Sequence, residues 1–178
     1  MMENNMEDNV TADDNVTAYD IFDKFNYDWV SEREINQAID AYVAQGGDIN
    51  ARDDSNCTFL HQAVEHNYVD VLDHLLSLEN IDVNTQAIGG NTPLHYEVTK
   101  GDSEIVTKLL DHPDIDTNIT NDNKKTAFAI AFDNKNGEII TLFTEFYDNT
   151  NNQSTRVGYL PRIKEEPNHG PNSPGSEL

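Results

Sequence analysis

Gly90-Asn91-Thr92-Pro93-Leu94-His95-Tyr96 is the segment of this 178-residue sequence that most strongly constrains its fold. Thr92 suits the N-cap of a helix, because its side-chain oxygen can accept a hydrogen bond from an unpaired backbone N–H. Pro93 suits the first helical position, where its missing N–H costs no hydrogen bond. Gly101 can end such a helix with little strain. The sequence therefore predicts a short helix between Thr92 and Gly101.

A second helix is predicted directly after the first. Asp102-Ser103 restarts the chain, and an apolar stripe with i, i+1, i+4, i+5 spacing follows at Ile105, Val106, Leu109 and Leu110. Such a stripe is typical of a helix that is buried on one side. Pro113 ends this helix, and Ile115-Asp116-Thr117-Asn118 leads into a turn-rich segment. The unit is thus helix, tight turn, helix and hairpin-like connection.

The unit recurs every 34 residues. Three families of positions share this interval: Thr58, Thr92 and Thr126; Leu60, Leu94 and Phe128; and Val71, Ile105 and Ile139. Asp-x-Asn triplets that start at Asp48, Asp82 and Asp116 keep the same spacing. A fixed period of this length indicates a solenoid of repeats rather than one globular core.

These residues resemble the ankyrin repeat family, and the match extends from Ile35 to Phe146. The resemblance implies an all-α repeat solenoid of about four ankyrin repeats, each a helix-turn-helix plus a hairpin loop, with degenerate terminal repeats that act as caps. It also implies that the motif histidines hydrogen-bond within and between repeat hairpins. The structural motif residues are Thr58, Leu60, His61, Thr92, Pro93, Leu94, His95, Gly101 and Thr126. Asn67 replaces the family's glycine, and Glu97 stands where the family prefers a small apolar residue.

Composition predicts the domain boundaries. Residues 1–16 are acidic and lack aromatic side chains, so we expect a disordered arm. Residues 17–148 form the expected repeat domain, with units at about 17–52, 53–86, 87–120 and 121–147. Residues 149–178 are rich in Asn, Pro, Gly and Ser, and we expect a disordered tail.

Two local expectations concern the terminal units. In the first unit, Trp29 is expected to pack at the turn between two helices, about Thr17 to Phe25 and Ser31 to Gln45. In the last unit, the second helix is expected from Glu138 to Phe146.

The charge balance limits the classes of partner. The 33 acidic residues outnumber 11 basic ones, which gives a formal net charge of −22. This charge repels phosphate backbones and anionic lipids, so neither a nucleic-acid partner nor a membrane is expected. The N-terminus lacks the basic and apolar residues of a secretory signal. Cys57, expected on an exposed hairpin, has no second cysteine for an internal disulfide.

The sequence predicts no enzyme. His61 and His66 lie five residues apart on one helix and face different ways, which does not match the spacing of a zinc-binding helix. No nucleophile elbow, phosphate loop or dinucleotide fingerprint occurs. We therefore expect no catalytic residue, no cofactor and no metal.

The family's variable positions supply the candidate binding surface. In the family, partners contact the hairpin tips and the outward positions of the first helices. The candidate residues are Arg52, Asp54, Ser55, Glu65, His66, Gln86, Ile88, Asn91, Thr99, Lys100, Asp122, Asn123 and Lys125. Ile88 is an apolar side chain at a predicted exposed tip, and Lys100, Lys124 and Lys125 are a basic minority on one edge of an acidic body. The hypothesis is that Ile88 enters a partner pocket whose acidic rim faces the lysines. The alternative is that these positions are merely solvated and variable.

The predicted function is a non-enzymatic protein–protein interaction module, a monomer in the cytoplasm. In style it resembles the small ankyrin proteins of intracellular bacteria or large DNA viruses, which favours a host-directed effector in the host cytosol or nucleus. One alternative is an inhibitor that resembles the inhibitor-of-NF-kappa-B class. Another is an acidic nucleic-acid mimic. The tail carries three short motifs that are common by chance: Ile163-Lys164-Glu165-Glu166, Ser173-Pro174 and Ser176-Glu177-Leu178.

Overall fold

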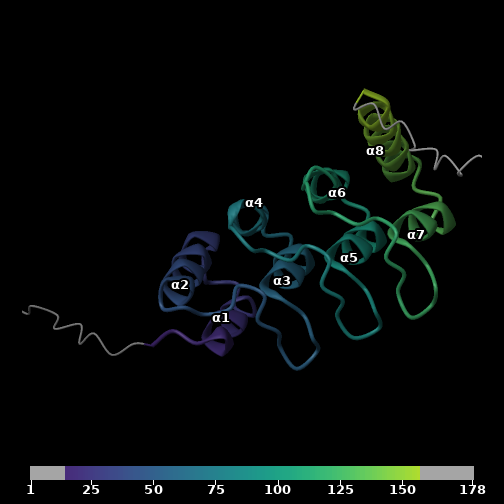
Figure 1. The fold of residues 1–178 in the computed structure, drawn as a ribbon. Helices are drawn as coiled ribbons and strands as arrows, with labels where there is room; N and C mark the ends of the chain where they lie inside the picture. Colours follow the sequence, from purple (N-terminus) through teal and green to yellow (C-terminus); the bar gives the residue numbers. More distant parts are fainter. Residues whose placement is uncertain (1–14, 157–178) are drawn as a thin grey trace, which may run out of the picture.

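The computed structural model describes residues 15–156, with side chains described to residue 150. Within these residues the chain forms eight helices in four consecutive pairs: α1 (Ala18–Lys24), α2 (Glu32–Ala44), α3 (Phe59–His66), α4 (Val69–Ser77), α5 (Pro93–Lys100), α6 (Ser103–Leu110), α7 (Ala127–Asp133) and α8 (Gly137–Arg156). Figure 1 shows α1, α3, α5 and α7 in one layer and α2, α4, α6 and α8 in the other, with long loops projecting from the first layer. The prediction of an all-α repeat solenoid is confirmed.

Threonine starts each helix of the inner layer, α1, α3, α5 and α7. The N-cap residues are Thr17, Thr58, Thr92 and Thr126. In α3 and α5 the side chain of a histidine three residues later contacts the N-cap threonine in turn, which completes a capping box. The Oγ1 atom of Thr58 lies 3.0 Å from Nδ1 of His61, and that of Thr92 lies 2.8 Å from Nδ1 of His95. These local pairs supply partners for groups that a helix N-terminus otherwise leaves unpaired.

A left-handed residue follows each inner helix from α3 onward. Asn67, Gly101 and Lys135 have φ of 58°, 95° and 55° and are spaced by one repeat. The reversed backbone turns the chain into the outer helix of the same pair. Only glycine adopts this conformation without steric cost, so Asn67 and Lys135 carry a local penalty.

The core lies between the two layers and continues from repeat to repeat. Its registered positions are at most 1% exposed: Leu60 and Leu94; Val71, Ile105 and Ile139; Leu75, Leu109 and Phe143. Inner helices contact their inner neighbours as well as their own outer helix, as with α3 against both α4 and α5. Each repeat therefore completes its core only with a neighbour, as expected of a solenoid.

Two local predictions were wrong. Trp29 does not fill the turn between α1 and α2, because it is 78% exposed and its ring lies tilted against that of Tyr27, with ring centroids 5.2 Å apart. Val30, which is 7% exposed, is buried there instead. Cys57 is buried rather than exposed, since its hairpin arm faces the next repeat and places its Sγ 3.8 Å from the hydroxyl of Tyr96.

The last helix is longer than expected. α8 runs to Arg156, so the expected end of the second helix at Phe146 and the boundary at residue 148 both fall inside it. No Gly or Pro interrupts the chain between Gly137 and Gly158, and an established helix adds one hydrogen bond per further residue. Residues 1–14 and the three tail motifs at 163–166, 173–174 and 176–178 lie outside the described residues.

Candidate partner-binding surface

The projecting loops are three copies of one tight hairpin. Backbone N–H groups of Asp53, Ala87 and Asn121 donate to the carbonyls of Cys57, Asn91 and Lys125 over 2.9–3.0 Å. The turn ends in a left-handed residue each time, at Asn56, Gly90 and Lys124. A side chain at Gly90 would meet the backbone of Asp122 at 2.8 Å, so this tip requires glycine. The hairpins are thus fixed by backbone geometry rather than loosely extended.

Hydrogen bonds join neighbouring hairpins at their tips. Ile88 N–H donates to the carbonyl of Ser55, and Asp122 N–H donates to that of Gly89, each over 3.0 Å. The three tips therefore form one row that runs along the solenoid, below α3, α5 and α7 in Figure 1. Because a hydrogen bond joins each hairpin tip to the one before it, the tip side chains are presented at fixed spacing.

The two motif histidines anchor this row to the inner helices. Nε2 of His61 lies 3.2 Å from the carbonyl oxygen of Asn91, and Nε2 of His95 lies 3.0 Å from that of Lys125. The N–H of Thr58 donates to Nδ1 of His61, so Nδ1 is the unprotonated nitrogen and Nε2 is the donor. Burial lowers the pKa of His61 to about 4 and also lowers the pKa of His95. Both rings are therefore neutral at physiological pH and serve the scaffold.

The structure places most candidate binding residues at the surface. Only Asn91 is half-buried, and the exposed ones are Arg52, Asp54, Ser55, Glu65, His66, Gln86, Ile88, Thr99, Lys100, Asp122, Asn123 and Lys125. The side-chain oxygen of Asn91 accepts a 2.9 Å hydrogen bond from Asn121, so this residue joins hairpins to each other. Ile88 is 64% exposed at the middle tip.

Two of the three lysines that the sequence singled out, Lys100 and Lys125, have partners within the chain. Nζ of Lys100 donates to the carbonyls of Val64 and Glu65 over 2.6 and 3.0 Å. These carbonyls end α3, where a helix carries partial negative charge. Lys125 forms a 2.6 Å ion pair with Asp133. Lys100 thus links two repeats, and Lys125 pairs within its own repeat. These contacts weaken the hypothesis that the lysines face an acidic rim on the partner.

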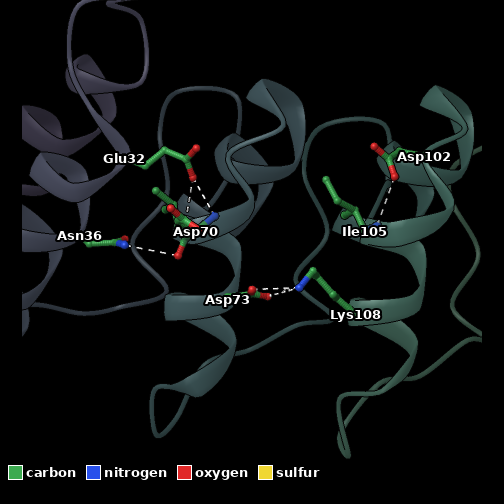
Figure 2. A network of polar contacts seen from close by, with 8 residues as sticks. Glu32, Asn36, Asp70, Asp73, Asp102, Ile105 and Lys108 are labelled. Carbon is green, nitrogen blue, oxygen red and sulfur yellow. Dashed lines mark hydrogen bonds and ion pairs between the residues drawn. The ribbon is translucent and has the colours of Figure 1, made fainter.

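Polar contacts in the outer layer also link one repeat to the next. Figure 2 shows the carboxylate of Glu32 beside the start of α4, where it accepts hydrogen bonds from the N–H groups of Asp70 and Val71 over 2.7 and 3.2 Å. Tyr68, the N-cap of α4, contributes no side-chain hydrogen bond, so Glu32 replaces it. Farther along, Lys108 contacts both carboxylate oxygens of Asp73 at 2.9 Å. These groups hold the outer helices in register.

Two exposed aromatic side chains were missed by the sequence reasoning. Tyr19 on α1 is 76% exposed, and Phe132 on α7 is 66% exposed. Phe132 follows Val64 and Val98 at the repeat interval, and those two are at most 1% exposed because the next inner helix covers them. The 34-residue register of Phe132 was the available signal: among the described residues no further inner helix follows α7, so this otherwise buried position is left uncovered.

One buried carboxylate stands out within α5. Glu97 is fully buried, its Oε1 accepts a 3.2 Å hydrogen bond from Asp102 N–H, and its Oε2 has no hydrogen-bond partner in the described part of the chain. Burial raises the pKa of this carboxyl group. Ala63 and Ala131 occupy the same register position in the flanking repeats. Glu97 is thus a local departure from the repeat pattern that costs stability when ionised.

The described residues contain no group of three or more His, Cys, Asp or Glu side chains arranged to hold a metal ion. Among the helices of this part, none has both the length and the apolar composition needed to cross a bilayer.

The paired helices, the left-handed connections and the hydrogen-bonded hairpin row define a helical repeat protein. A family model described as "Ankyrin repeats (3 copies)" matches residues 60–155. The chain belongs to the ankyrin repeat family. This family generally comprises non-catalytic modules for protein–protein interaction.

Curated relatives match parts of this chain. The human transient receptor potential cation channel subfamily A member 1 is 33% identical over 94 residues, which cover 53% of this chain and 8% of the channel. Alpha-latrotoxin-Lh1a of Latrodectus hasselti is 40% identical over 52 residues, or 29% of this chain and 4% of the toxin. Ankyrin repeat protein FPV222 of fowlpox virus (strain NVSL) is 27% identical over 127 residues, or 70% of this chain and 16% of the viral protein. The chain thus spans a small part of each relative's length.

Proposed function

We propose that this chain is a non-enzymatic binding module that holds a partner protein against its hairpin tips and inner helices. The observation that carries the proposal is the exposure of Ile88, which is 64% exposed at the tip of its hairpin. The N–H of Ile88 itself is hydrogen-bonded to the preceding hairpin, so the tip is held in place. A rigid, exposed tip lowers the entropy cost of burying its apolar side chain, because a partner does not have to order the backbone on binding. The outer layer, by contrast, uses its polar groups to link repeats.

A substitution at Ile88 tests this proposal. Partners are first captured from a lysate by the full chain and identified by mass spectrometry, and the affinity of each purified partner is then measured by calorimetry. Ile88→Glu should weaken an authentic partner by about tenfold or more, because it removes buried apolar area and adds a charge. Val43→Glu is the matched control: Val43 is 37% exposed but lies on α2 in the outer layer. Equal affinities of the Ile88→Glu and Val43→Glu proteins would overturn the proposal.

A host-directed role is the finer form of this proposal. The similarity to a fowlpox virus ankyrin repeat protein over 70% of the chain supports it. Within this role, inhibition of a transcription factor in the manner of the inhibitor-of-NF-kappa-B class predicts that co-expression keeps that factor out of the nucleus. We place the protein in the cytoplasm, or in the host cytosol or nucleus, as a monomer. Light scattering coupled to size-exclusion chromatography checks the monomer.

The acidic nucleic-acid mimic differs from this proposal in its salt dependence. Binding driven by the −22 charge alone should weaken steeply as ionic strength rises, because exposed charges are screened beyond a Debye length of about 8 Å in physiological salt. Binding through Ile88 should persist. Affinities measured in low and high salt therefore separate the two functions.

A further inference from the structure

A cavity of about 360 Å³ lies between α1 and the first hairpin, at the N-terminal end of the tip row. Its lining includes aromatic, carboxylate, guanidinium and amide groups, from Tyr19, Phe22, Asp23, Arg52, Asp54 and Gln62. Figure 1 shows the two segments that line it, α1 and the loop that precedes α3. Of the candidate binding residues, only Arg52, Asp54 and Ser55 of the first hairpin line this cavity.

The row of tip hydrogen bonds has an unused donor at this cavity. Ile88 and Asp122 each donate their N–H to the hairpin before them. Asp54 is the equivalent residue of the first hairpin, one repeat earlier, and its N–H has no hydrogen-bond partner among the described residues. No hairpin precedes α1 in that part of the chain. An extended segment could therefore continue the row by offering a carbonyl to Asp54.

The chemistry of the lining favours a cation. Asp23, Asp53 and Asp54 face a single Arg52, which gives a net charge of −2 around the cavity. The carboxylate of Asp53 is occupied by the N–H groups of Ser55 and Cys57 and by the amide of Gln62. The carboxylate of Asp54 has no such partner among the described residues. A Lys or Arg side chain over the exposed ring of Tyr19 would gain both a cation–π contact and this carboxylate.

Charge also argues against the chain's own N-terminal segment as the occupant. Residues 1–14 contain five acidic side chains and no Lys or Arg. Placing them beside three aspartates would bring like charges together, which is unfavourable. A basic segment from another protein is complementary where this segment is not.

We propose that the cavity is a subsite for an extended, basic segment of a partner protein. A Lys or Arg side chain lies between the Tyr19 ring and the Asp54 carboxylate, and a backbone carbonyl of the same segment accepts a hydrogen bond from Asp54 N–H. This subsite rests on the proposed binding function and extends its interface from Ile88 to the N-terminal end of the hairpin row.

The test uses a peptide as the probe. The full-length, ¹⁵N-labelled chain is titrated with acetyl-Ala-Ala-Arg-Ala-Ala-amide while backbone amide shifts are followed by NMR. We expect saturable shifts at Asp54 and at its neighbours in the cavity, with little change at Asp82 and Asp116 on other loops. The same peptide with neutral citrulline in place of Arg should bind several-fold more weakly. Shifts spread over all acidic loops, or no saturation at millimolar peptide, would overturn the subsite.

Variants then separate the two contacts. Tyr19→Ala and Asp54→Asn should each weaken the peptide about two- to fivefold, since one removes the ring and the other the charge. Asp54→Pro also removes the N–H, at the turn position where proline is favoured, and should weaken binding about tenfold. Asp122→Asn is the matched control, because it removes the same charge from the equivalent position of the third hairpin. Equal losses for Asp54→Asn and Asp122→Asn would indicate general charge attraction and contradict the proposal.

Failure of this subsite and failure of the binding function give different results. If the peptide does not bind while Ile88→Glu still releases captured partners, the subsite is wrong and the module function stands. If Ile88→Glu and Val43→Glu retain partners equally, the module function itself is wrong.

Discussion

At the scale of single residues, His61 and His95 do the most to join the inner helices to the hairpins. Each ring spans from the N-cap threonine of its own helix to a carbonyl of the next hairpin. Both are at most 2% exposed, so a proton added to either ring would be buried without a counter-charge in direct contact. Protonation of either ring therefore disfavours the folded state.

Acid should destabilise the protein through His61. Its folded-state pKa of about 4 lies below the ordinary value of 6.5, so the unfolded chain binds the proton first as pH falls. The contribution to the unfolding free energy is intact above pH 6.5 and is lost progressively between pH 6.5 and 4, by about 3 kcal/mol in all. Urea denaturation at pH 7, 6, 5 and 4 measures it.

A comparison of two variants isolates this contribution. His61→Ala should be less stable than wild type at pH 7, because the Asn91 carbonyl loses its donor, and should lose less further stability in acid. His66→Gln, at an exposed position of the same helix, should keep the wild-type pH dependence. Glu97 acts in the opposite direction, because its raised pKa means that the folded state gains stability as pH falls. Both variants retain Glu97, so its contribution cancels in the comparison. Parallel pH profiles for wild type and His61→Ala would contradict the assignment.

At the scale of elements, the left-handed residues after the inner helices set how each pair of helices turns. Gly101 adopts its φ of 95° freely, whereas Lys135 holds φ of 55° against steric repulsion from its own Cβ. The same turn is thus built three times at different local cost.

Glycine at position 135 should stabilise the last repeat. Lys135→Gly relieves the strain and should raise the unfolding free energy by about 1 kcal/mol, seen as a higher urea midpoint with an unchanged slope. The adjacent Asn134 has φ of −74°, so Asn134→Gly gains nothing and should lower the midpoint by adding backbone freedom in the unfolded chain. Equal shifts for the two variants would show that the left-handed backbone carries no strain.

At the scale of the whole molecule, place along the solenoid decides what a repeated side chain contributes. Val98 is covered by α7, but Phe132, at the same register one repeat later, is 66% exposed. Stability in such arrays depends on interfaces between neighbouring repeats, and the repeat of α7 and α8 has only one such interface among the described residues.

Truncation at these two sites should therefore give unequal losses. Val98→Ala opens a cavity between α5 and α7 and should cost about 2 kcal/mol. Phe132→Ala removes a larger side chain but should cost less than about 1 kcal/mol, because that ring is mostly in water already. Chemical denaturation of both proteins checks the order, and a larger loss at Phe132 would mean that another segment of the chain covers it.

The helix starts, the 34-residue period and the buried stripes could be read from the sequence because they depend on nearby residues. A threonine N-cap acts within three residues, and an apolar stripe within two turns. The partners of Asn91, Lys100 and Cys57 could not be read in this way. Each contacts a residue 30 or more positions away, so its role depends on how one repeat packs on the next.

Local chemistry along the chain was thus enough to specify the repeat unit and its solenoid class, and the resemblance to the ankyrin repeat family placed Ile88 at an exposed tip. Only the packed structure settled which surface groups remain available to a partner. Lys100 and Lys125 became contacts within the chain, Trp29 stayed in solvent, and α8 ran past the expected boundary. The physical reason is that a solenoid defines its units by short-range interactions, while the ends and the surface depend on which neighbour is present to cover them.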